Sequence, residues 1–510
     1  MTTEARPETI SEDPGASSTR DTTPADACGG SELVERFAGA PDRPGRLLLA
    51  DAVGRSATSV TPIDRVEDRR RLAALRAVVT TETEPLAVLT EMLRWCRDDH
   101  AVLWEQLGDP ACQAWRTEAL RPFHEQVSSP AAIPVIDAST RQLLDAGLGK
   151  VPDRIPAVVA AHVFAQLLDA RYAHAFGRAL RRRGPVELRV GDPLPLDDPG
   201  LRQVVSVPLT SPPWRLANRL DETRHIRLAG RWAEEFRVVL DFGLTGALAG
   251  LADASSSVAT CHPNRSVEEL RLGQVHRGRL FPVAPADEAA QQKVLDDLIG
   301  QAVDAGARIV VLPELSVTAR LAARLQRWVE RPDGLTVLVA GSYHHSEHGR
   351  GRNTAATWVR GVTDPLVADK YSPGDRPLPE GIEPEGRPEV RVHVADGWHL
   401  VVAICRDLLN PNAVHALSEV GANLVLVPAM SERVLAFAGQ AAQLVGSCQA
   451  VVAVANNPAA WPHLDGPASS VPRAVFGHPS LPQQTVLMDT PHVDPGVALL
   501  ELGTGATRWL

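Results

Sequence analysis

Three polar residues in the second half of the chain follow apolar, β-rich runs, which is where reactive side chains are expected in an α/β protein. Glu314 follows ARIVVLP, Lys370 follows DPLVAD, and Cys405 closes LVVAI. In such sheets, reactive groups gather at the carboxyl ends of the strands, where the chain leaves the core for a loop. A thiol becomes a nucleophile when a base takes its proton, so Glu314 and Cys405 together could start nucleophilic catalysis.

Lysine is rare in this chain, which makes the position of Lys370 informative. Of 52 lysine and arginine residues, only Lys150, Lys293 and Lys370 are lysines. An ammonium is a compact point charge, whereas a guanidinium is a wide planar fork. A site that must stabilise an oxyanion with a small cation would therefore keep a lysine where the rest of the chain uses arginine.

The ordered set of motifs resembles the nitrilase, or carbon–nitrogen hydrolase, superfamily over about residues 268–480. GARIVVLPELSVT, VADKYSPGD and VVAICRDLLNP resemble its glutamate, lysine and cysteine motifs, and GANLVLVPAM and AVVAVANNP resemble the strands that follow. The resemblance implies an α/β fold, a four-layer α-β-β-α sandwich, without metal or cofactor. It implies that Glu314 is the general base, that Lys370 stabilises the oxyanion, and that Cys405 carries an acyl-thioester.

The family usually has a second glutamate shortly after the lysine, which orients the lysine. The segment YSPGDRPLPEGIEPEG offers Glu380, Glu383 and Glu385. Glu380 has the most family-like offset from Lys370, so it is the predicted fourth catalytic residue, with the other two left open.

Three further residues are predicted to bind substrate. Arg406 and Asp407 directly follow the cysteine, and Asn456 ends the run AVVAVAN. The family commonly has a larger, often aromatic residue after the cysteine, so Arg406 is a departure that would change the polarity of the pocket. The alternatives are that Arg406 and Asp407 pair with each other and that Asn456 only caps a strand.

The histidines and the remaining cysteines suggest no metal site. The tract YHHSEHGR at 343–350 places two histidines next to each other, which a strand would point to opposite faces, and it is interpreted as a surface loop. The six cysteines lack the paired spacing of a zinc site or a disulfide framework.

The chain divides into three predicted parts. Residues 1–30 are polar and rich in Thr, Ser and Pro, which predicts a disordered tail. Residues 31–260 are predicted to be a mainly helical domain of unknown role, with Phe164, Leu168 and Tyr172 on one helical stripe. Residues 267–510 alternate short β-rich runs with helical stretches and form the predicted α/β, nitrilase-like domain.

Composition excludes several classes of partner. The formal charge of −10 disfavours nucleic acid, which requires a basic face. No signal peptide and no apolar run long enough for a membrane helix are recognised, so a cytoplasmic protein is expected. A homo-oligomer is implied by the resemblance only.

The predicted function is cysteine-dependent hydrolysis of a small-molecule amide or carbamoyl group, preferred over a nitrile because most branches of the family cleave amides. Two other hypotheses stay open. The nitrilase-like domain could be a sensor or assembly module whose partner-binding or effector part is residues 31–260. Alternatively, an amine instead of water could resolve the thioester, which would make the protein an acyltransferase.

Overall fold

The computed structural model describes residues 64–510 apart from 127–128, 182–183, 196–225, 252–254, 275–277, 376–378, 462–470, 482 and 489–492. The predicted disordered tail at 1–30 lies outside the described residues. Among the described residues, no helix combines the length and apolar character that crossing a bilayer would require.

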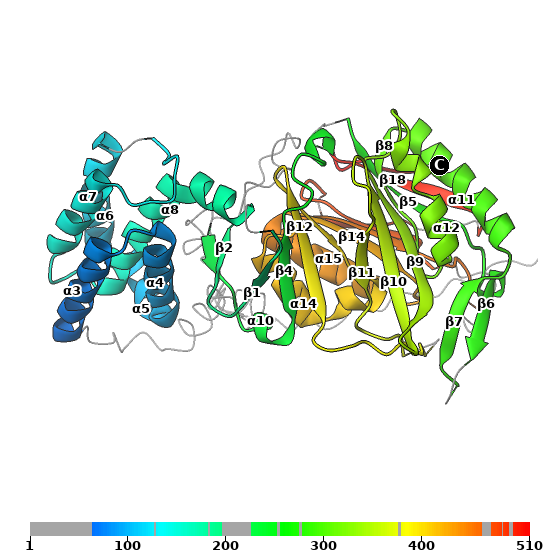
Figure 1. Ribbon diagram of the computed structural model, residues 1–510, viewed down its shortest axis with the longest axis horizontal. Coiled ribbons are helices and arrows are strands. Elements are labelled where there is room, and N and C mark those ends of the chain that lie inside the picture. The colour runs from blue at the N-terminus through cyan, green and yellow to red at the C-terminus, as the bar shows by residue number, and fades with distance from the viewer. Residues whose placement is uncertain are drawn as a thin grey trace, which may run out of the picture.

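Residues 64–181, called the helical unit below, confirm the predicted helical character of this part of the chain. Its helices are α3 (Arg65–Thr81), α4 (Pro85–Asp98), α5 (His100–Leu107), α6 (Pro110–Gln126), α7 (Ala138–Gly149) and α8 (Ala157–Arg181). Their apolar faces share a core that includes Leu89, Phe164 and Tyr172. Figure 1 shows these helices, in blue and cyan, to one side of the two large sheets and set apart from them.

Residues 186–510, called the layered unit below, contain two large sheets. The first has the strand order β1 (Val186–Leu188), β4 (Arg237–Asp241), β12 (Glu389–Ala395), β13 (Trp398–Val402), β14 (Leu424–Ala429), β15 (Val451–Asn456), β16 (Ala474–Gly477) and β17 (Thr485–Met488). The second has the order β11 (Leu366–Asp369), β10 (Arg350–Val359), β9 (Val337–Glu347), β8 (Ala307–Val311), β5 (Ser257–His262), β18 (Gly496–Glu501) and β19 (Thr507–Trp509).

The two sheets pack face to face, and alternation along their strands explains why. Ile309 and Val311 of β8 lie in the core between the sheets, whereas Val310 faces the helices on the other side. On β14, Leu426 likewise faces the other sheet and Val425 faces its own helices. Because side chains alternate between the two faces of a strand, continuously apolar runs fit a sheet that is buried on both faces.

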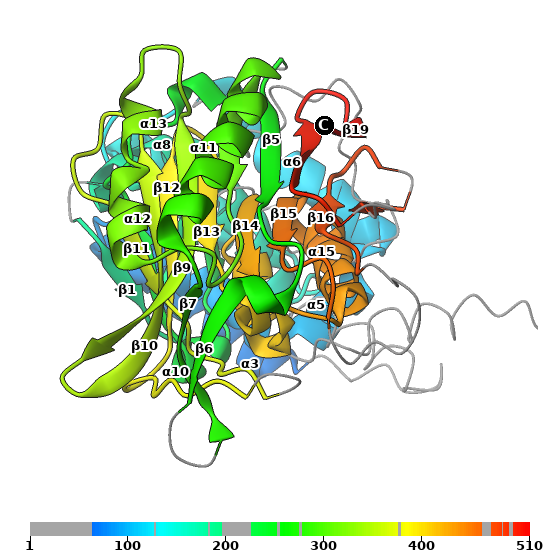
Figure 2. The ribbon, with the colours of Figure 1, turned by 90° about the vertical axis from the view of Figure 1, so that its right-hand side faces the viewer.

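Helices cover the outer face of each sheet. Those on the first sheet are α14 (Pro411–Glu419) and α15 (Val434–Cys448), and those on the second are α11 (Glu288–Asp304), α12 (Ala319–Arg324) and α13 (Arg327–Glu330). Figure 2 looks onto α11, α12 and α13 in front of the second sheet. The layers therefore run helix, sheet, sheet, helix, which confirms the predicted four-layer α-β-β-α sandwich.

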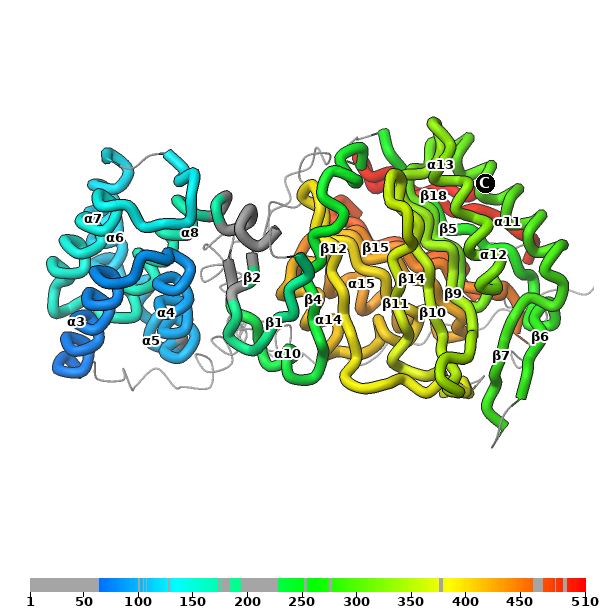
Figure 3. Tube along the Cα trace, in the orientation of Figure 1, coloured from blue at the N-terminus to red at the C-terminus, as the bar shows by residue number. Residues whose placement is uncertain are grey.

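The layered unit begins earlier than the predicted boundary near residue 260. β1 pairs with β4, β4 runs parallel to β12, and β5 pairs with both β8 and β18. Two strands inside 31–260, β1 and β4, and the start of β5 thus belong to the sandwich. Figure 3 shows β1 and β4 beside β12. The place of β1 and β4 in the sandwich escapes sequence reasoning because both strands are short and residues 189–236 separate them.

Smaller elements complete the unit. They are β2 (Pro193–Pro195), β3 (Ile226–Leu228), α10 (Trp232–Glu235), the hairpin of β6 (Leu270–Gln274) and β7 (Leu280–Pro285), and the 3-10 turns η2 (Ala249–Leu251), η3 (Val267–Glu269) and η5 (Cys405–Leu409). The β6–β7 hairpin projects from the sandwich in Figure 1, and its strand β7 lies against β9.

Candidate active site

Glu314, Lys370 and Cys405 each lie just beyond the carboxyl end of a strand. Glu314 follows β8, Lys370 directly follows β11, and Cys405 begins η5 after β13. All three residues are buried, and all three line one cavity of about 350 Å³. The structure therefore brings together the three residues that the sequence singled out.

The turn that carries Glu314 depends on a glycine in the neighbouring strand. Gly341 of β9 has a φ of +71°, and a Cβ there would lie 2.6 Å from the carbonyl oxygen of Pro313. Only glycine allows β9 to pass this close to the turn, because it lacks a Cβ and tolerates a positive φ. Leu315, on the other side of Glu314, also has a positive φ, of 56°.

The ammonium of Lys370 lies between two buried carboxylates. Its Nζ is 2.7 Å from Oε1 of Glu314 and 2.6 Å from Oε2 of Glu380. Burial lowers the pKa of Lys370, but the charges of Glu314 and Glu380 outweigh this effect and hold the pKa well above its usual value. The side chain is therefore a permanent cation at neutral pH.

Glu380 is the member of the predicted trio that reaches the site. Glu385 pairs instead with Arg352, and its side chain is 56% exposed. Each carboxylate oxygen of Glu380 accepts two hydrogen bonds. Oε2 accepts from Lys370 and from the backbone N–H of Gly374, and Oε1 accepts from Asn353 and His344. Burial favours the neutral form, but Lys370 and then His344 outweigh it, so the pKa of Glu380 is well below its usual range.

Asn353 is a member of the site that sequence reasoning missed. It lies on β10, and its Nδ2 donates to Oε1 of Glu314 at 2.9 Å and to Oε1 of Glu380 at 2.7 Å. One amide thus fixes both carboxylates. The available signal was an asparagine at the start of the segment NTAATWV, which is too common a feature to identify a site.

His344 corrects the interpretation of YHHSEHGR as a surface loop. The tract continues β9 and turns into β10, where His344 pairs with Asn353 in the sheet register. The side chain of His344 is fully buried. Its Nδ1 accepts from the backbone N–H of Val283 in β7, so its Nε2 carries the proton that is donated to Glu380. The polar sequence suggested a loop because β9 and β10 extend beyond the sandwich. In this part of the strands, successive side chains point alternately toward the site and toward solvent.

Cys405 has a strained backbone and a thiol close to Glu314. Its φ is +48°, which costs energy in a residue with a Cβ and is common at functional sites. Burial raises the pKa of the thiol well above its usual value, and the charge of Glu314 adds to this, while Lys370 opposes it. Among the described residues, the two N–H donors to Glu314 both use Oε1, and the thiol of Cys405 donates to the carbonyl oxygen of Met430 at 3.8 Å. The resting cysteine is therefore a neutral thiol beside a carboxylate.

Asp407 has a different place from the one predicted, because it does not line the cavity of Cys405. Its carboxylate accepts backbone N–H groups of Tyr371 and Ser372, at 3.3 and 2.8 Å, just after Lys370. Burial raises its pKa to about 8, although Lys370 and these backbone donors lower it. Asp407 therefore connects the segment after the cysteine to the segment after the lysine.

Arg406 and Asn456 differ in their relation to the cavity. Arg406 lines it and pairs with Asp375 at 2.7 Å instead of with Asp407. Asn456 does not line it; its side chain makes two hydrogen bonds of 2.9 Å with the backbone of Ser431, which does. Asn456 therefore supports the cavity wall without lining the cavity, and Arg406 is the one of the three predicted substrate-binding residues that lines it.

The rest of the cavity wall is mainly apolar. It includes Leu280 and Val283 of the hairpin, Leu409 and Met430, and Trp461. The indole N–H of Trp461 is buried and has no hydrogen-bond partner among the described residues. No cluster of potential metal ligands is present among the described residues.

Fold and site together define a class: a four-layer α-β-β-α protein with a buried Glu–Lys–Cys cluster at its strand ends. No family model and no curated protein matches the chain. Solved structures do match. An amidase from Nesterenkonia sp. is 18% identical with a TM-score of 0.37, over 49% of this chain and 91% of that one. A mutant of the Nesterenkonia AN1 amidase, described as from the nitrilase superfamily, is 20% identical with a TM-score of 0.36, over 48% and 89%.

A further match is a mutant of the same amidase with the acetamide moiety of fluoroacetamide added covalently at its active-site cysteine. It is 18% identical with a TM-score of 0.35, over 49% of this chain and 91% of that one. These neighbours come from the superfamily that the motifs resemble. A likeness at this identity and TM-score assigns no activity to the present chain.

Proposed function

We propose that the layered unit hydrolyses a non-peptide carbon–nitrogen bond, in an amide or carbamoyl group in preference to a nitrile. One arrangement supports this proposal most. The ammonium of Lys370 is hydrogen-bonded to the buried carboxylates of Glu314 and Glu380, and the carboxylate of Glu314 lies beside the thiol of Cys405. Burying three charged groups in one place costs a large desolvation free energy. Perturbed titratable groups around a cavity are typical of active sites.

In the first half of the reaction, the thiol of Cys405 is acylated. Glu314 takes the proton from Sγ as the sulfur attacks the carbonyl carbon, and the electron pair of the C=O bond moves to oxygen. The oxyanion is stabilised by Lys370 and by the backbone N–H of Arg406. When the C–N bond breaks, Glu314 returns its proton to the departing nitrogen, which leaves as ammonia or an amine.

In the second half, water resolves the thioester. Glu314 takes a proton from a water molecule as its oxygen attacks the thioester carbon, and Lys370 again stabilises the oxyanion. The C–S bond breaks, the acid is released, and the sulfur of Cys405 regains the proton from Glu314. Atoms balance over the cycle: one amide and one water give one acid and one ammonia or amine.

Glu380 acts in this scheme as a positioning residue. Four hydrogen bonds hold it ionised, and the ionised carboxylate keeps Lys370 charged and fixed. Without Glu380, the lysine would have one carboxylate partner, Glu314, and that pairing would compete with the transfer of the thiol proton.

The test combines thiol labelling with activity. Wild type and Cys405→Ala are incubated with small aliphatic amides and assayed for ammonia, and intact-protein mass spectrometry follows labelling by iodoacetamide. Cys405 should label fastest, and Cys405→Ala should release no ammonia, whereas the control Cys448→Ala should behave as wild type. Ammonia release by Cys405→Ala equal to that of wild type would overturn the proposal.

Hydroxylamine added to the same assay separates hydrolysis from acyl transfer. A thioester that amines resolve would give a hydroxamate at the expense of the free acid. We expect the acid to remain the main product at moderate hydroxylamine concentrations, because the proposed general base acts on water.

A further inference from the structure

The cavity that contains Cys405 adjoins a second cavity, called the outer cavity below. The outer cavity has a volume of about 660 Å³, compared with about 350 Å³ for the inner one. Gly374, Asp375, Glu380, Arg406 and Leu409 line both. A substrate that reaches Cys405 through the outer cavity therefore passes Arg406.

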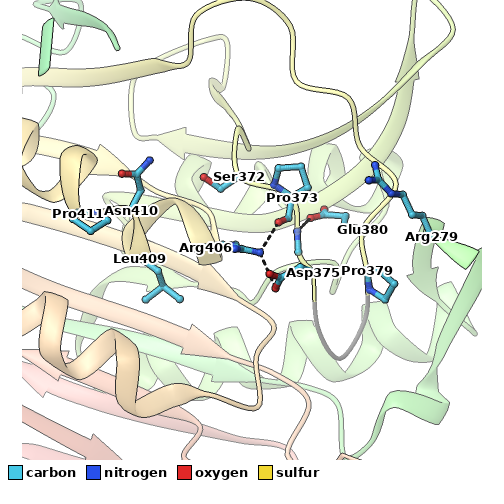
Figure 4. A pocket seen from close by; sticks show the side chains of 11 residues that line it. Arg279, Ser372, Pro373, Asp375, Pro379, Glu380, Arg406, Leu409, Asn410 and Pro411 are labelled. Atoms are coloured by element: carbon cyan, nitrogen blue, oxygen red, sulfur yellow. Dashed lines mark hydrogen bonds and ion pairs between the residues drawn. The ribbon is translucent and has the colours of Figure 1, made fainter. Parts of the chain in front are cut away.

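Arginines dominate the charge of this entrance. Arg279 and Arg406 line the outer cavity, and Arg406 and Arg433 line the inner one. Figure 4 shows Arg279 and Arg406 on opposite sides of the outer cavity, with Asp375 between them in this view. Of the carboxylates that line either cavity, Glu314 and Glu380 are bonded to Lys370, which leaves Asp375 as the lining carboxylate that opposes the arginines.

The entrance thus has the opposite sign to the protein as a whole, whose formal charge is −10. Local potential inside a concave, low-dielectric site affects which ligands accumulate there more than the net charge of the protein does. Arg279 is exposed, and it has no ion pair with a described residue. Arg433 is 74% exposed, and its ion pair with Glu432 is 3.8 Å long. Both guanidinium groups are therefore available to a ligand.

The ion pair of Arg406 indicates what kind of ligand fits. Its Nη1 donates to the carbonyl oxygen of Pro373 at 3.2 Å and contacts Asp375 at 2.7 Å. The pair is solvent-exposed, at 42% for Arg406 and 72% for Asp375, and exposed ion pairs are weak. A carboxylate from a ligand can therefore take the place of Asp375, because a guanidinium fork binds carboxylates with two parallel hydrogen bonds.

The structure assigns a substrate class to this site, and the assignment rests on the proposed function. We propose that the substrate is a small amide or carbamoyl compound whose far end carries a carboxylate. The reacting end lies at Cys405, the apolar wall of Leu280, Met430 and Trp461 receives a short hydrocarbon spacer, and Arg406, supported by Arg279, binds the carboxylate.

Two alkylating agents of nearly equal size test the charge preference without any turnover. Iodoacetate is an anion and iodoacetamide is neutral; each replaces the thiol hydrogen of Cys405 and releases iodide. The ratio of their rate constants at Cys405, followed by peptide mass spectrometry, reports the field at the thiol. We expect Arg406→Gln and Arg279→Gln to lower the ratio of iodoacetate to iodoacetamide, together by about tenfold. Raised salt should lower it in wild type.

The control variant is Arg320→Gln, which removes an arginine that is 68% exposed on α12 and pairs with Glu288. It should leave the ratio unchanged. A ratio that does not fall in the double variant Arg279→Gln/Arg406→Gln would overturn the proposed carboxylate site, even if Cys405 labels fast and neutral amides are hydrolysed.

Hydrolysis of matched amides gives the second measurement. Succinamate carries a carboxylate where butanamide carries a methyl group. Wild type should have the higher kcat/KM for succinamate, and Arg406→Gln should raise KM much more for succinamate than for butanamide. Equal loss on both amides would mean that Arg406 serves the reacting end and would overturn the assignment. If neither amide, nor any other amide tested, releases ammonia, the proposed function itself fails, whereas the alkylation ratio still reports on the entrance.

Discussion

The core of the helical unit and the site of the layered unit are both buried, but they are built from opposite kinds of residue. The former is a cluster of Leu, Val, Met and aromatic side chains around Phe164. The latter places Glu314, Lys370 and Glu380 in direct contact at the end of a similarly apolar sandwich. Apolar burial stabilises a fold without further partners. Buried charges are tolerated only with complete pairing, so their presence indicates selection for chemistry over stability.

The largest expected effect is on activity and concerns Cys405. Replacing it with Ala should reduce amide hydrolysis by roughly 10⁴-fold or more, because the nucleophile is lost. The free energy of unfolding should change by only about 1 kcal/mol, since a small group is removed at the edge of a cavity. Ammonia release and urea titration measure the two quantities. Unchanged hydrolysis would mean that the buried charged site of the layered unit does not carry out the reaction through Cys405.

Lys370→Met should affect both activity and stability. Loss of the ammonium leaves two buried carboxylates facing each other, which costs about 3–5 kcal/mol of unfolding free energy. Loss of the oxyanion partner should reduce kcat by about 10³-fold. Lys370→Arg serves as the control: it keeps the charge and most of the stability but not the compact geometry, so its kcat should stay low. Full stability of Lys370→Met would show that the cluster is not charged as described.

Phe164→Ala provides the converse test in the helical unit. The ring of Phe164 is fully buried and packs edge-on against Trp115 with centroids 6.3 Å apart. Its removal should cost about 3–5 kcal/mol of unfolding free energy, with kcat per folded molecule unchanged. Val66→Ala, at a position that is 79% exposed, is the matched control with almost no effect. A loss of kcat in Phe164→Ala would mean that the helical unit takes part in the reaction.

The sequence was sufficient for the parts of the site whose position follows from strand ends. Glu314 and Cys405 could be located because each follows an apolar run that forms a mostly buried strand. Lys370 follows the edge strand β11, whose side chains are partly exposed, and could be located by the motif VADKYSPGD. Asn353 and His344 could not be located in this way, because they lie within β9 and β10 and become neighbours only through the register of the two strands. Register depends on packing of the whole sheet, which a local pattern does not contain.

The same distinction explains Asp407 and the domain boundary. Asp407 is two residues from the nucleophile, and proximity in sequence suggested contact with substrate; the 3-10 turn directs it instead to the backbone of Tyr371 and Ser372. β4 is a short strand that joins the first sheet by pairing with β12, about 150 residues further along the chain, and β1 joins the sheet by pairing with β4. Long-range pairing of this kind leaves little trace in local periodicity.

His344 allows a finer test of the buried site. His344→Leu removes the N–H donor to Glu380 and leaves the backbone N–H of Val283 without its acceptor. We expect kcat to fall about tenfold with little change in KM, as for one lost hydrogen bond to a charged group. His344→Gln can retain a donor to Glu380 and should recover much of kcat. Equal losses in both variants would mean that His344 only fills space.

Asp407 should make the free energy of unfolding depend on pH. Its pKa in the folded protein is about 8, whereas its ordinary value is 3.8, so the folded state binds the proton more tightly than the unfolded state between these two values. Unfolding then releases a proton, and the free energy of unfolding must fall as pH rises from about 4 to 8. Asp407→Asn keeps the shape without the titration. The stability of wild type minus that of Asp407→Asn, from urea titrations at several pH values, should therefore decrease across this window. A difference that rises with pH would mean that the backbone N–H groups of Tyr371 and Ser372 outweigh burial and keep the carboxylate ionised.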